Sequence, residues 1–434
     1  MQTTDKEIIV RKSNMKIFPW YKMFSWDLLF FYSISFLFLV DVKGLTPAQV
    51  ILTDAFYPFF KFVLQPISTI IIGKLGKRNS LIFANSLINI YLVLIMLVDC
   101  FENVVFATFF CSFGYIIKNM CEANFLYESV PHCKTRGEIF SKIDGRGFAY
   151  FYLFDGITSF FTGFSYVINP YFPIIISIAL NTIAILLSTM LKEIPKDTAE
   201  TLKSGDNKPI LEVFKDFIKN FRYGFRYVHK SGRLRSLVMI YSIFYGILVL
   251  TLPLRRSLLK EMNVSAENFG IIFAVLGIIA AISANRQNLI HKMFRNRTIT
   301  VLTVPYCLSC AVIGLLPFFN LDYSFWIVMI CFALQFIIRG PFYTLIKRYL
   351  NNFSTSKARD KIYSVATFFE SLSAFLVTGF GSLLVEWRDS SFAFLLLGII
   401  STIVVLIVLS YMKTRVGLKP EEYKKEEIEM LNLK

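Results

Sequence analysis

Long continuous runs of apolar residues recur along the whole chain, separated by short polar turns. Each run is about 20 residues long, which is the length a helix needs to cross about 30 Å of hydrocarbon. Strands of a membrane barrel would instead alternate in polarity over about 10 residues. The pattern therefore predicts an all-α membrane protein with twelve transmembrane helices, at 24–42, 48–73, 80–98, 104–126, 145–167, 171–191, 236–254, 268–288, 299–317, 323–345, 362–385 and 391–412.

The two halves of the chain repeat at an offset of 219 residues without a gap. At this offset the polar turn Gly44–Gln49 falls on Asn263–Asn268, and the basic turn Gly76–Arg78 falls on Arg295–Arg297. Parallel repeats of this kind occur in secondary transporters, where a cavity between the halves opens alternately to each side. We therefore expect two pseudo-symmetric six-helix halves, with boundaries at 1–23 (cytoplasmic tail), 24–191 (first half), 192–235 (linker), 236–412 (second half) and 413–434 (cytoplasmic tail).

The hydrophilic linker contains an amphipathic stretch. From Ile210 to Val228, apolar residues recur every three or four positions with basic residues between them, as in a helix with one apolar face. Such a helix can lie in the membrane interface while its bases face anionic lipid. A regulatory protein partner is the alternative interpretation of the same pattern.

Composition and charge fix the class of protein and its orientation. The chain is 55% hydrophobic and 18% charged, with a mean hydropathy of +0.56, which excludes an ordinary soluble protein. If the N-terminus is cytoplasmic, 37 Lys and Arg residues lie on the cytoplasmic side and five on the outer side. This bias predicts that both termini are cytoplasmic in a plasma-membrane protein, and it explains the net charge of +16 without nucleic acid. The five outer residues are Lys43, Arg255, Arg256, Lys260 and Arg388.

Enzymatic chemistry has little support in the sequence. Cys307 and Cys310 form a C-x-x-C pair, but it lies within an apolar run without a nearby histidine or second pair. A glycine-rich phosphate loop with Lys and Ser or Thr is absent from the sequence, which argues against ATP-driven pumping. We expect no metal, no cofactor and no enzymatic activity.

Short motifs occur in an order that is typical of one transporter family. They are Gly44–Thr46, Gly73–Arg78, Leu126–Ser129, Phe140–Arg146 and Arg339–Pro341. On these motifs the chain resembles the major facilitator superfamily over about residues 20–412, and more narrowly its bacterial drug-exporter-like members. The resemblance implies the twelve-helix fold of that family, secondary transport, and gating roles for Gly73, Lys74, Gly76, Lys77, Arg78 and Arg146.

Two departures from the family pattern bear on mechanism. The family usually has an Asp and then a basic residue where this chain has Gly73 and Lys74. Many proton-driven drug antiporters carry a Gly-Pro in the fifth helix, and 155–163 contains no proline. The first departure changes the energetics of the gate, and the second weakens the antiporter interpretation.

Charges within the apolar runs are the best candidates for a functional site, because each is costly in hydrocarbon unless it faces a cavity or a partner. Lys118 and Glu122 are spaced i, i+4, so we expect them to meet on one helix face, either as a proton-dependent pair or as a static pair. Related exporters carry an Arg near the position of Lys118 that is linked to proton movement. Asp27 fits a helix N-terminal carboxylate. The other proton-coupling candidates are Asp155, Glu370 and Asp54, and the candidates for lining a substrate cavity are Lys61, Arg339, Tyr57, Phe125, Tyr152, Tyr245 and Tyr343.

The sequence thus predicts a monomeric secondary transporter that works by alternating access in the lipid bilayer. Proton-coupled export of an amphipathic small molecule is the preferred interpretation. The alternatives are a cation-coupled importer of a polar solute and a membrane sensor that transports nothing. A sensor would carry a folded soluble domain, whereas the longest segment outside the predicted helices is 192–235.

The predicted orientation can be tested by labelling single cysteines in intact cells. We expect an impermeant thiol reagent to label Lys260→Cys from outside, and to label Lys134→Cys only after the cells are permeabilised. The opposite labelling pattern would invert the topology.

Overall fold

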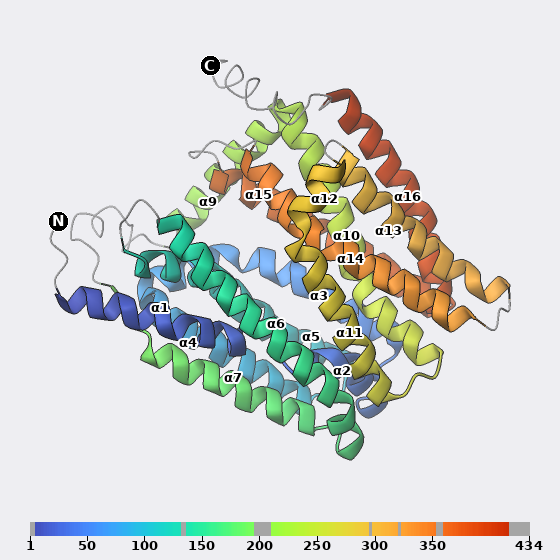
Figure 1. Ribbon diagram of the computed structural model, residues 1–434, viewed down its shortest axis with the longest axis horizontal. Coiled ribbons are helices and arrows are strands. Elements are labelled where there is room, and N and C mark those ends of the chain that lie inside the picture. Colours follow the sequence, from blue (N-terminus) through green and yellow to red (C-terminus); the bar gives the residue numbers. More distant parts are fainter. Residues whose placement is uncertain are drawn as a thin grey trace. The chain divides into compact units, whose positions relative to one another are not determined.

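The structure is a computed structural model that describes residues 5–131, 136–194, 210–294, 297–319, 323–352 and 359–415. Lys134, which the labelling prediction uses, lies outside the described residues. Helices account for nearly all of the described chain, and these residues contain no strand (Figure 1). The predicted all-α membrane fold is therefore confirmed.

The helices follow one another along the chain with short connections. In chain order they are α1 (Asp5–Ser25), α2 (Phe31–Leu37), the π-helix η1 (Phe38–Val42), α3 (Pro47–Val63), α4 (Gln65–Leu97), α5 (Phe101–Ser129), α6 (Arg136–Ile168), α7 (Phe172–Met190), α9 (Ile210–Lys230), α10 (Gly232–Glu261), α11 (Ala266–Asn285), α12 (Gln287–Phe294), α13 (Thr298–Leu315), the 3-10 helix η3 (Leu316–Phe318), α14 (Ser324–Asn352), α15 (Arg359–Trp387) and α16 (Ser390–Arg415).

Nine helices within the described residues are long and apolar enough to cross a membrane. They match nine of the twelve predicted runs. The runs 24–42, 48–73 and 145–167 are also helical, in the α1–α2–η1 segment, in α3 with the start of α4, and in α6. The number of twelve crossing helices remains a prediction.

The first helix starts earlier than its apolar run suggests. Residues 5–25, most of which the sequence assigns to a tail, form α1, which packs against α5, α6 and α7. Two of its polar side chains, Arg11 and Asn14, are buried and bond to neighbouring helix ends. Arg11 donates to the carbonyl of Val130 at 3.1 Å, and Asn14 donates to the carbonyl of Lys192 at 2.7 Å. Most of the predicted tail is therefore helical and packed, and its cytoplasmic location remains a prediction.

The predicted basic turn after the second run is present at Gly76. Gly76 has φ +76°, a left-handed conformation that favours glycine, and it divides α4 into two helical segments. The first segment continues the course of α3 after a break at Leu64, which Pro66 follows. The run 48–73 is thus two helical pieces rather than one.

The chain divides into two compact units. Unit 1 comprises Met1–Leu45, Phe59–Asp216 and Ser265–Ala274, and unit 2 comprises Thr46–Pro58, Phe217–Val264 and Val275–Lys434. Most of α3 therefore groups with the second unit, and the start of α11 groups with the first. Helices α3 and α11 occupy equivalent positions of the repeat, and a segment of each groups with the opposite unit, as an internal repeat predicts.

The same neighbour relations occur in both units. In unit 1, α4 packs against α5 and α7, and α1 packs against α6 and α7. In unit 2, α13 packs against α14 and α16, and α10 packs against α15 and α16. Helix ends agree with the 219-residue offset, because Pro47 and Ala266 start α3 and α11, and Ile168 and Trp387 end α6 and α15. The predicted repeat is confirmed by this packing.

Two equivalent close contacts show the repeat at single residues. In unit 2, Ser382 on α15 donates a hydrogen bond to the Ala48 carbonyl on α3 at 2.7 Å. In unit 1, a side chain at Gly163 on α6 would place its Cβ 2.6 Å from the Cα of Glu267 on α11. Gly163 and Ser382 are 219 residues apart, as are Ala48 and Glu267. Both crossings therefore need a small residue at the same position of the repeat.

The crossing at Gly163 provides a test of this packing. We expect Gly163→Val to destabilise the protein by about 1–3 kcal/mol, because the added methyl groups must displace the α11 backbone. Gly156→Val is the matched control on the same helix, because a Cβ at Gly156 meets nothing within 4 Å. The measurement is thermal unfolding of both purified variants in detergent, and equal midpoints would contradict the close crossing.

Candidate functional site

The buried polar groups of unit 1 gather at an interruption between α1 and α2. We call Ser25, Asp27, Tyr115, Lys118 and Glu122 the break cluster. The interruption spans Trp26–Phe30, within the run that the sequence predicts as one helix. Phe30 has φ +68°, which is costly for a residue other than glycine. Such strain persists only where the surrounding structure holds it in place.

Asp27 ends α1 by taking the hydrogen bonds that would continue it. The Leu28 N–H donates to Asp27 Oδ1 at 2.8 Å, and the Leu29 N–H donates to the Asp27 carbonyl at 3.0 Å. In a continuous helix the Leu29 N–H would bond to the Ser25 carbonyl. That carbonyl therefore needs another donor, and water is not available inside a bilayer.

Lys118 supplies the missing donor. It is fully buried in α5, and its ammonium group donates to the carbonyl of Ser25 and, at 3.5 Å, to the carbonyl of Trp26. The same Nζ lies 4.0 Å from the ring centroid of Tyr115, one helical turn earlier. The position of Lys118 is therefore explained by the interrupted backbone of α1.

Ser177 of α7 satisfies the other side of the interruption. The N–H of Phe31 donates to Ser177 Oγ at 3.1 Å, and the Ser177 hydroxyl donates to the carbonyl of Leu29. Helices α5 and α7, far apart in the sequence, thus bind the interruption from two sides. The sequence did not predict this role for Lys118 or Ser177.

The carboxylates of the break cluster lie around the ammonium group without bonding to it directly. Glu122 accepts a hydrogen bond from the Ser25 hydroxyl at 3.2 Å, and Asp27 accepts one from the Tyr115 hydroxyl at 3.2 Å. Among the described contacts, Lys118 and Glu122 are joined through Ser25 and form no direct ion pair. The two residues share a helix face as predicted, but the expected direct pair is replaced by this bridge.

Asp155 on α6 approaches the break cluster from another helix. It is half-buried, and its carboxylate is close enough to Asp27 for the two charges to repel each other. The described residues provide no hydrogen-bond donor to the Asp155 carboxylate; Thr158 donates only to its backbone carbonyl, at 3.1 Å. Asp155 thus differs from Asp27 and Glu122, which both have donors.

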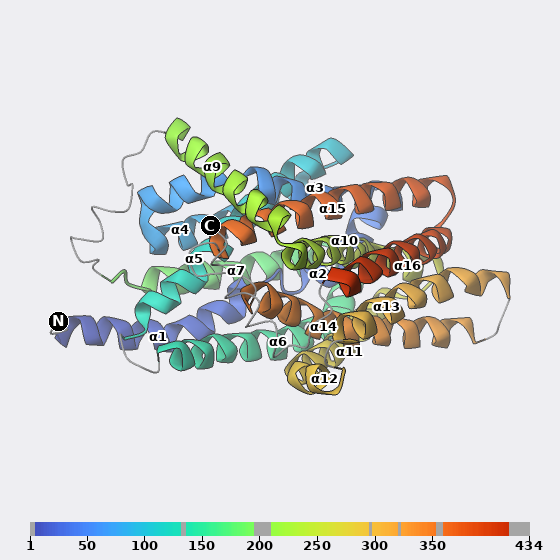
Figure 2. The same ribbon diagram turned by 90° about the horizontal axis from the view of Figure 1, so that it is seen from above.

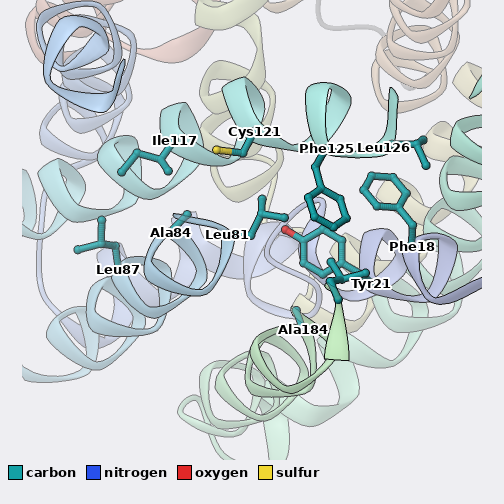
Figure 3. Close-up of a cluster of buried hydrophobic side chains, with 11 residues drawn as sticks. Phe18, Tyr21, Leu81, Ala84, Leu87, Ile117, Cys121, Phe125, Leu126 and Ala184 are labelled. Atoms are coloured by element: carbon teal, nitrogen blue, oxygen red, sulfur yellow. The ribbon is translucent and has the colours of Figure 1, made fainter. Parts of the chain in front are cut away.

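Phe125, a predicted cavity residue, is a packing residue. It lies in a hydrophobic cluster with Phe18, Tyr21 and Leu81, and only 3% of its surface is exposed (Figure 3). Figure 3 shows Tyr21 reaching from α1 toward α4, where Asn85 donates to its hydroxyl at 3.3 Å. The prediction that Phe125 lines a cavity is therefore wrong.

The predicted gating turn is held by acidic residues from other helices. Lys77 forms an ion pair with Glu128 at the end of α5, and the N–H of Arg78 donates to Glu193 at 3.0 Å. These two glutamates supply negative charge to a turn that lacks the family's Asp at Gly73. Gly73 and Lys74 are exposed, so the contacts of the turn come from its second half.

The remaining unit 1 candidates are separated from the break cluster in their contacts. Arg146 is exposed and donates to the Tyr150 hydroxyl at 3.2 Å. Tyr152 is 49% exposed and stacks on Phe148. Lys61 is half-buried, and the described residues offer it no hydrogen bond or ion pair. The structure therefore does not bring these three residues together.

Unit 2 carries a second buried polar group, around Glu370 of α15. Tyr241 of α10 donates its hydroxyl hydrogen to Glu370 Oε2 at 2.7 Å. The rings of Tyr241 and Tyr245 are 6.0 Å apart, and those of Tyr245 and Tyr343 are 5.9 Å apart. Tyr57 lies close to Tyr245. Glu370, Tyr57, Tyr245 and Tyr343, all predicted from the sequence, thus share one aromatic site.

Arg255 is a buried charge that sequence reasoning assigned to the outer surface. It is fully buried in α10, donates to Gln335 Oε1 at 2.7 Å, and lies 4.9 Å from the ring centroid of Phe336. Arg339, a predicted site residue, lies 5.9 Å from the same ring. Arg256 is also buried and acts on the charge of Asp54. Both arginines lie near the end of an apolar run, so the sequence alone did not indicate that they are buried.

Metal binding finds no support in the part of the chain that the structure describes. It contains no group of three or more His, Cys, Asp or Glu side chains that could hold an ion. Cys307 and Cys310 are buried, and the amide of Gln335 donates to the sulfur of Cys310 at 3.5 Å.

Known proteins share this fold. Residues 289–431 match the family model of the Major Facilitator Superfamily. A variant of the nucleoside transporter NupG superposes with a TM-score of 0.71 at 12% identity, covering 93% of this chain and all of its own. The D-xylose-proton symporter gives 0.68 at 11% identity, covering 95% of this chain and 98% of its own. Among curated proteins, none matches the chain in sequence.

A POT family transporter in complex with 5-aminolevulinic acid has the same fold, with a TM-score of 0.65 at 13% identity, covering 94% of this chain and 96% of its own. Residues 289–431 thus match the superfamily model, and the chain has the fold of these solved transporters. Both findings support the resemblance to this superfamily that the sequence motifs indicate.

The role of Lys118 in holding the interruption can be measured as stability. We expect Lys118→Met to lower the free energy of unfolding by about 1–3 kcal/mol, because buried carbonyls of Ser25 and Trp26 lose their donor. Lys61→Met is the control, since it removes another lysine of unit 1, a half-buried one, but no described hydrogen bond. Thermal unfolding of the purified variants in detergent distinguishes them; equal losses would contradict a specific role for Lys118.

Proposed function

We propose that the protein is a proton-coupled secondary transporter that exports an amphipathic small molecule by alternating access. The observation that carries this proposal is the break cluster, in which Asp27 and Glu122 lie around a buried ammonium group at an interrupted helix and Asp155 lies close to Asp27. Interrupted helices in transporters mark substrate and ion sites. We place the protein in the plasma membrane as a monomer, with both termini cytoplasmic.

Asp155 is the carrier that this geometry favours over the Lys118–Glu122 pair. Lys118 is committed to backbone carbonyls, so releasing it would leave the interruption unsatisfied. Asp155 has no such commitment among the described contacts, and binding a proton removes its repulsion with Asp27. Because desolvated charge is costly in the membrane, the protonated and charged forms favour different arrangements of α6 against α1.

The aromatic site in unit 2 supports an amphipathic substrate. Tyr241, Tyr245 and Tyr343 offer ring faces beside the carboxylate of Glu370. Aromatic faces and a carboxylate together suit an organic cation, which gains from both. Ethidium is therefore a suitable probe of this class.

A cation-coupled importer of a polar solute is the second candidate. It is favoured by the hydrogen bond between Arg255 and Gln335, which is the kind of fixed polar contact that a small polar solute needs. The similar fold of a D-xylose-proton symporter also fits this candidate.

The two candidates and the carrier can be tested together in proteoliposomes with an imposed pH gradient. We expect ethidium to accumulate in vesicles with an acidic lumen, and D-xylose and uridine to show no gradient-driven uptake. Asp155→Asn should reduce uphill ethidium accumulation at least about tenfold while ethidium exchange between the two sides continues, because only the coupling proton is lost.

Glu122→Gln and Glu370→Gln are the matched variants, each removing one carboxylate elsewhere. Unchanged uphill transport in Asp155→Asn with loss in Glu122→Gln would transfer the carrier role to Glu122, and loss only in Glu370→Gln would transfer it to unit 2. Gradient-driven uptake of a polar solute without ethidium transport would replace export by import.

A further inference from the structure

The amphipathic helix α9 packs across the start of α15 in unit 2 (Figure 2). The rings of Phe221 and Phe368 are 5.3 Å apart. A side chain at Gly224 would place its Cβ 2.8 Å from the carbonyl carbon of Lys361, so only a glycine allows the two backbones to come this close. The helix is therefore docked on the membrane bundle and is not a loose part of the linker.

This contact fixes the depth of α9 in the bilayer. The candidate membrane span of α15 begins at Lys361, and Phe368 lies seven residues further along. At 1.5 Å per residue, the contact is about 10 Å inside the start of the span. The headgroup region on each side of the hydrocarbon has a similar thickness. The middle of α9 therefore lies at the end of the α15 span, between Lys361, which Gly224 meets, and Phe368, and this end corresponds to the membrane interface.

One edge of the apolar face of α9 is left uncovered at this depth. Gly224 and Val228 are buried against unit 2. Ile218 is 60% exposed, and Phe225 is 43% exposed although its ring stacks on Phe369 at 6.2 Å. At 100° per residue, Ile218 and Phe225 lie together on one side of the buried stripe. Exposed apolar side chains at the membrane interface are positioned to enter the lipid.

A basic face adjoins this uncovered edge. Residues 217–230 contain no Asp or Glu, and every Lys and Arg among them is exposed. Arg222 and Arg226 follow directly after the Ile218–Phe225 edge around the helix, and Lys219 and Lys230 lie beyond them. A free anion would meet the bases but leave the apolar edge bare, whereas a phospholipid has an anionic headgroup and an acyl chain to meet both.

We propose that α9 is a binding site for anionic phospholipids of the adjacent leaflet. The headgroup phosphate binds Arg222 and Arg226, and the acyl chain covers Ile218 and Phe225. This site is distinct from the proton-coupling residues, and it does not depend on the direction of transport.

The test uses a fluorescent probe on the full-length protein in nanodiscs. Cys100, which is exposed, and Cys133, which lies outside the described residues, are first replaced by Ser, and NBD is attached to Ile218→Cys. We expect spin-labelled lipid to quench this probe at least about twofold more in discs with phosphatidylglycerol than in discs of phosphatidylcholine alone. Asn220→Cys is the control position, since it is exposed on the opposite flank, about 200° around the helix.

The basic face is tested by reversing its charge. Arg222→Glu with Arg226→Glu should abolish the dependence on phosphatidylglycerol, whereas Lys142→Glu with Lys292→Glu, an equal change at two exposed lysines elsewhere, should leave it intact. Equal quenching at positions 218 and 220 would overturn the lipid-facing edge. Quenching at 218 that is the same in both lipids, or that survives Arg222→Glu with Arg226→Glu, would overturn recognition of the anionic headgroup. A probe at 218 that lipid does not quench but an added acidic peptide does would assign the face to a protein partner instead.

Discussion

The interruption of the first helix at Trp26–Phe30 imposes the constraint that organises unit 1. Backbone N–H and C=O groups released inside a membrane must be satisfied by protein, because each unsatisfied group is costly there. Asp27 takes the N–H groups, Lys118 takes the carbonyls of Ser25 and Trp26, and Ser177 bridges Leu29 and Phe31. The buried charge of α5 is therefore first of all a structural partner of α1.

The bonds that these charged residues make to the backbone limit the role that each can have in transport. Lys118 donates to two backbone carbonyls, so its displacement would leave them unsatisfied, and we place the mobile proton on a carboxylate instead. Glu122 and Asp27 each accept a hydrogen bond from a hydroxyl, while Asp155 borders them without a donor among the described residues. On our proposal, movement of α6, which carries Asp155, against α1 is coupled to the same interruption that Lys118 stabilises.

Sequence periodicity predicts the features of the fold that depend on the hydrophobic effect, and the structure agrees with it at the turns Gly44–Gln49 and Gly76–Arg78. It fails where polar side chains are buried by specific bonds. Arg11 and Asn14 look like tail residues and Arg255 looks like a surface residue, because hydropathy counts their charge or polarity and cannot see their partners. Phe125 shows the reverse error, since an aromatic residue near a charged pair can still belong to the packed core.

The internal repeat is not kept at the break cluster, and this difference marks the cluster as special to unit 1. At the 219-residue offset, Gly246 stands at the position of Asp27 and Ile337 at that of Lys118. Accordingly α10 continues unbroken through Gly246, where Ser373 of α15 packs so closely that a side chain would have no room. Two units with the same helix packing thus differ at the one place where α1 is interrupted. Selection for folding alone would allow both first helices to be continuous, so the interruption and its charges are best explained by a task that unit 1 performs and unit 2, with its aromatic site at Glu370, does not.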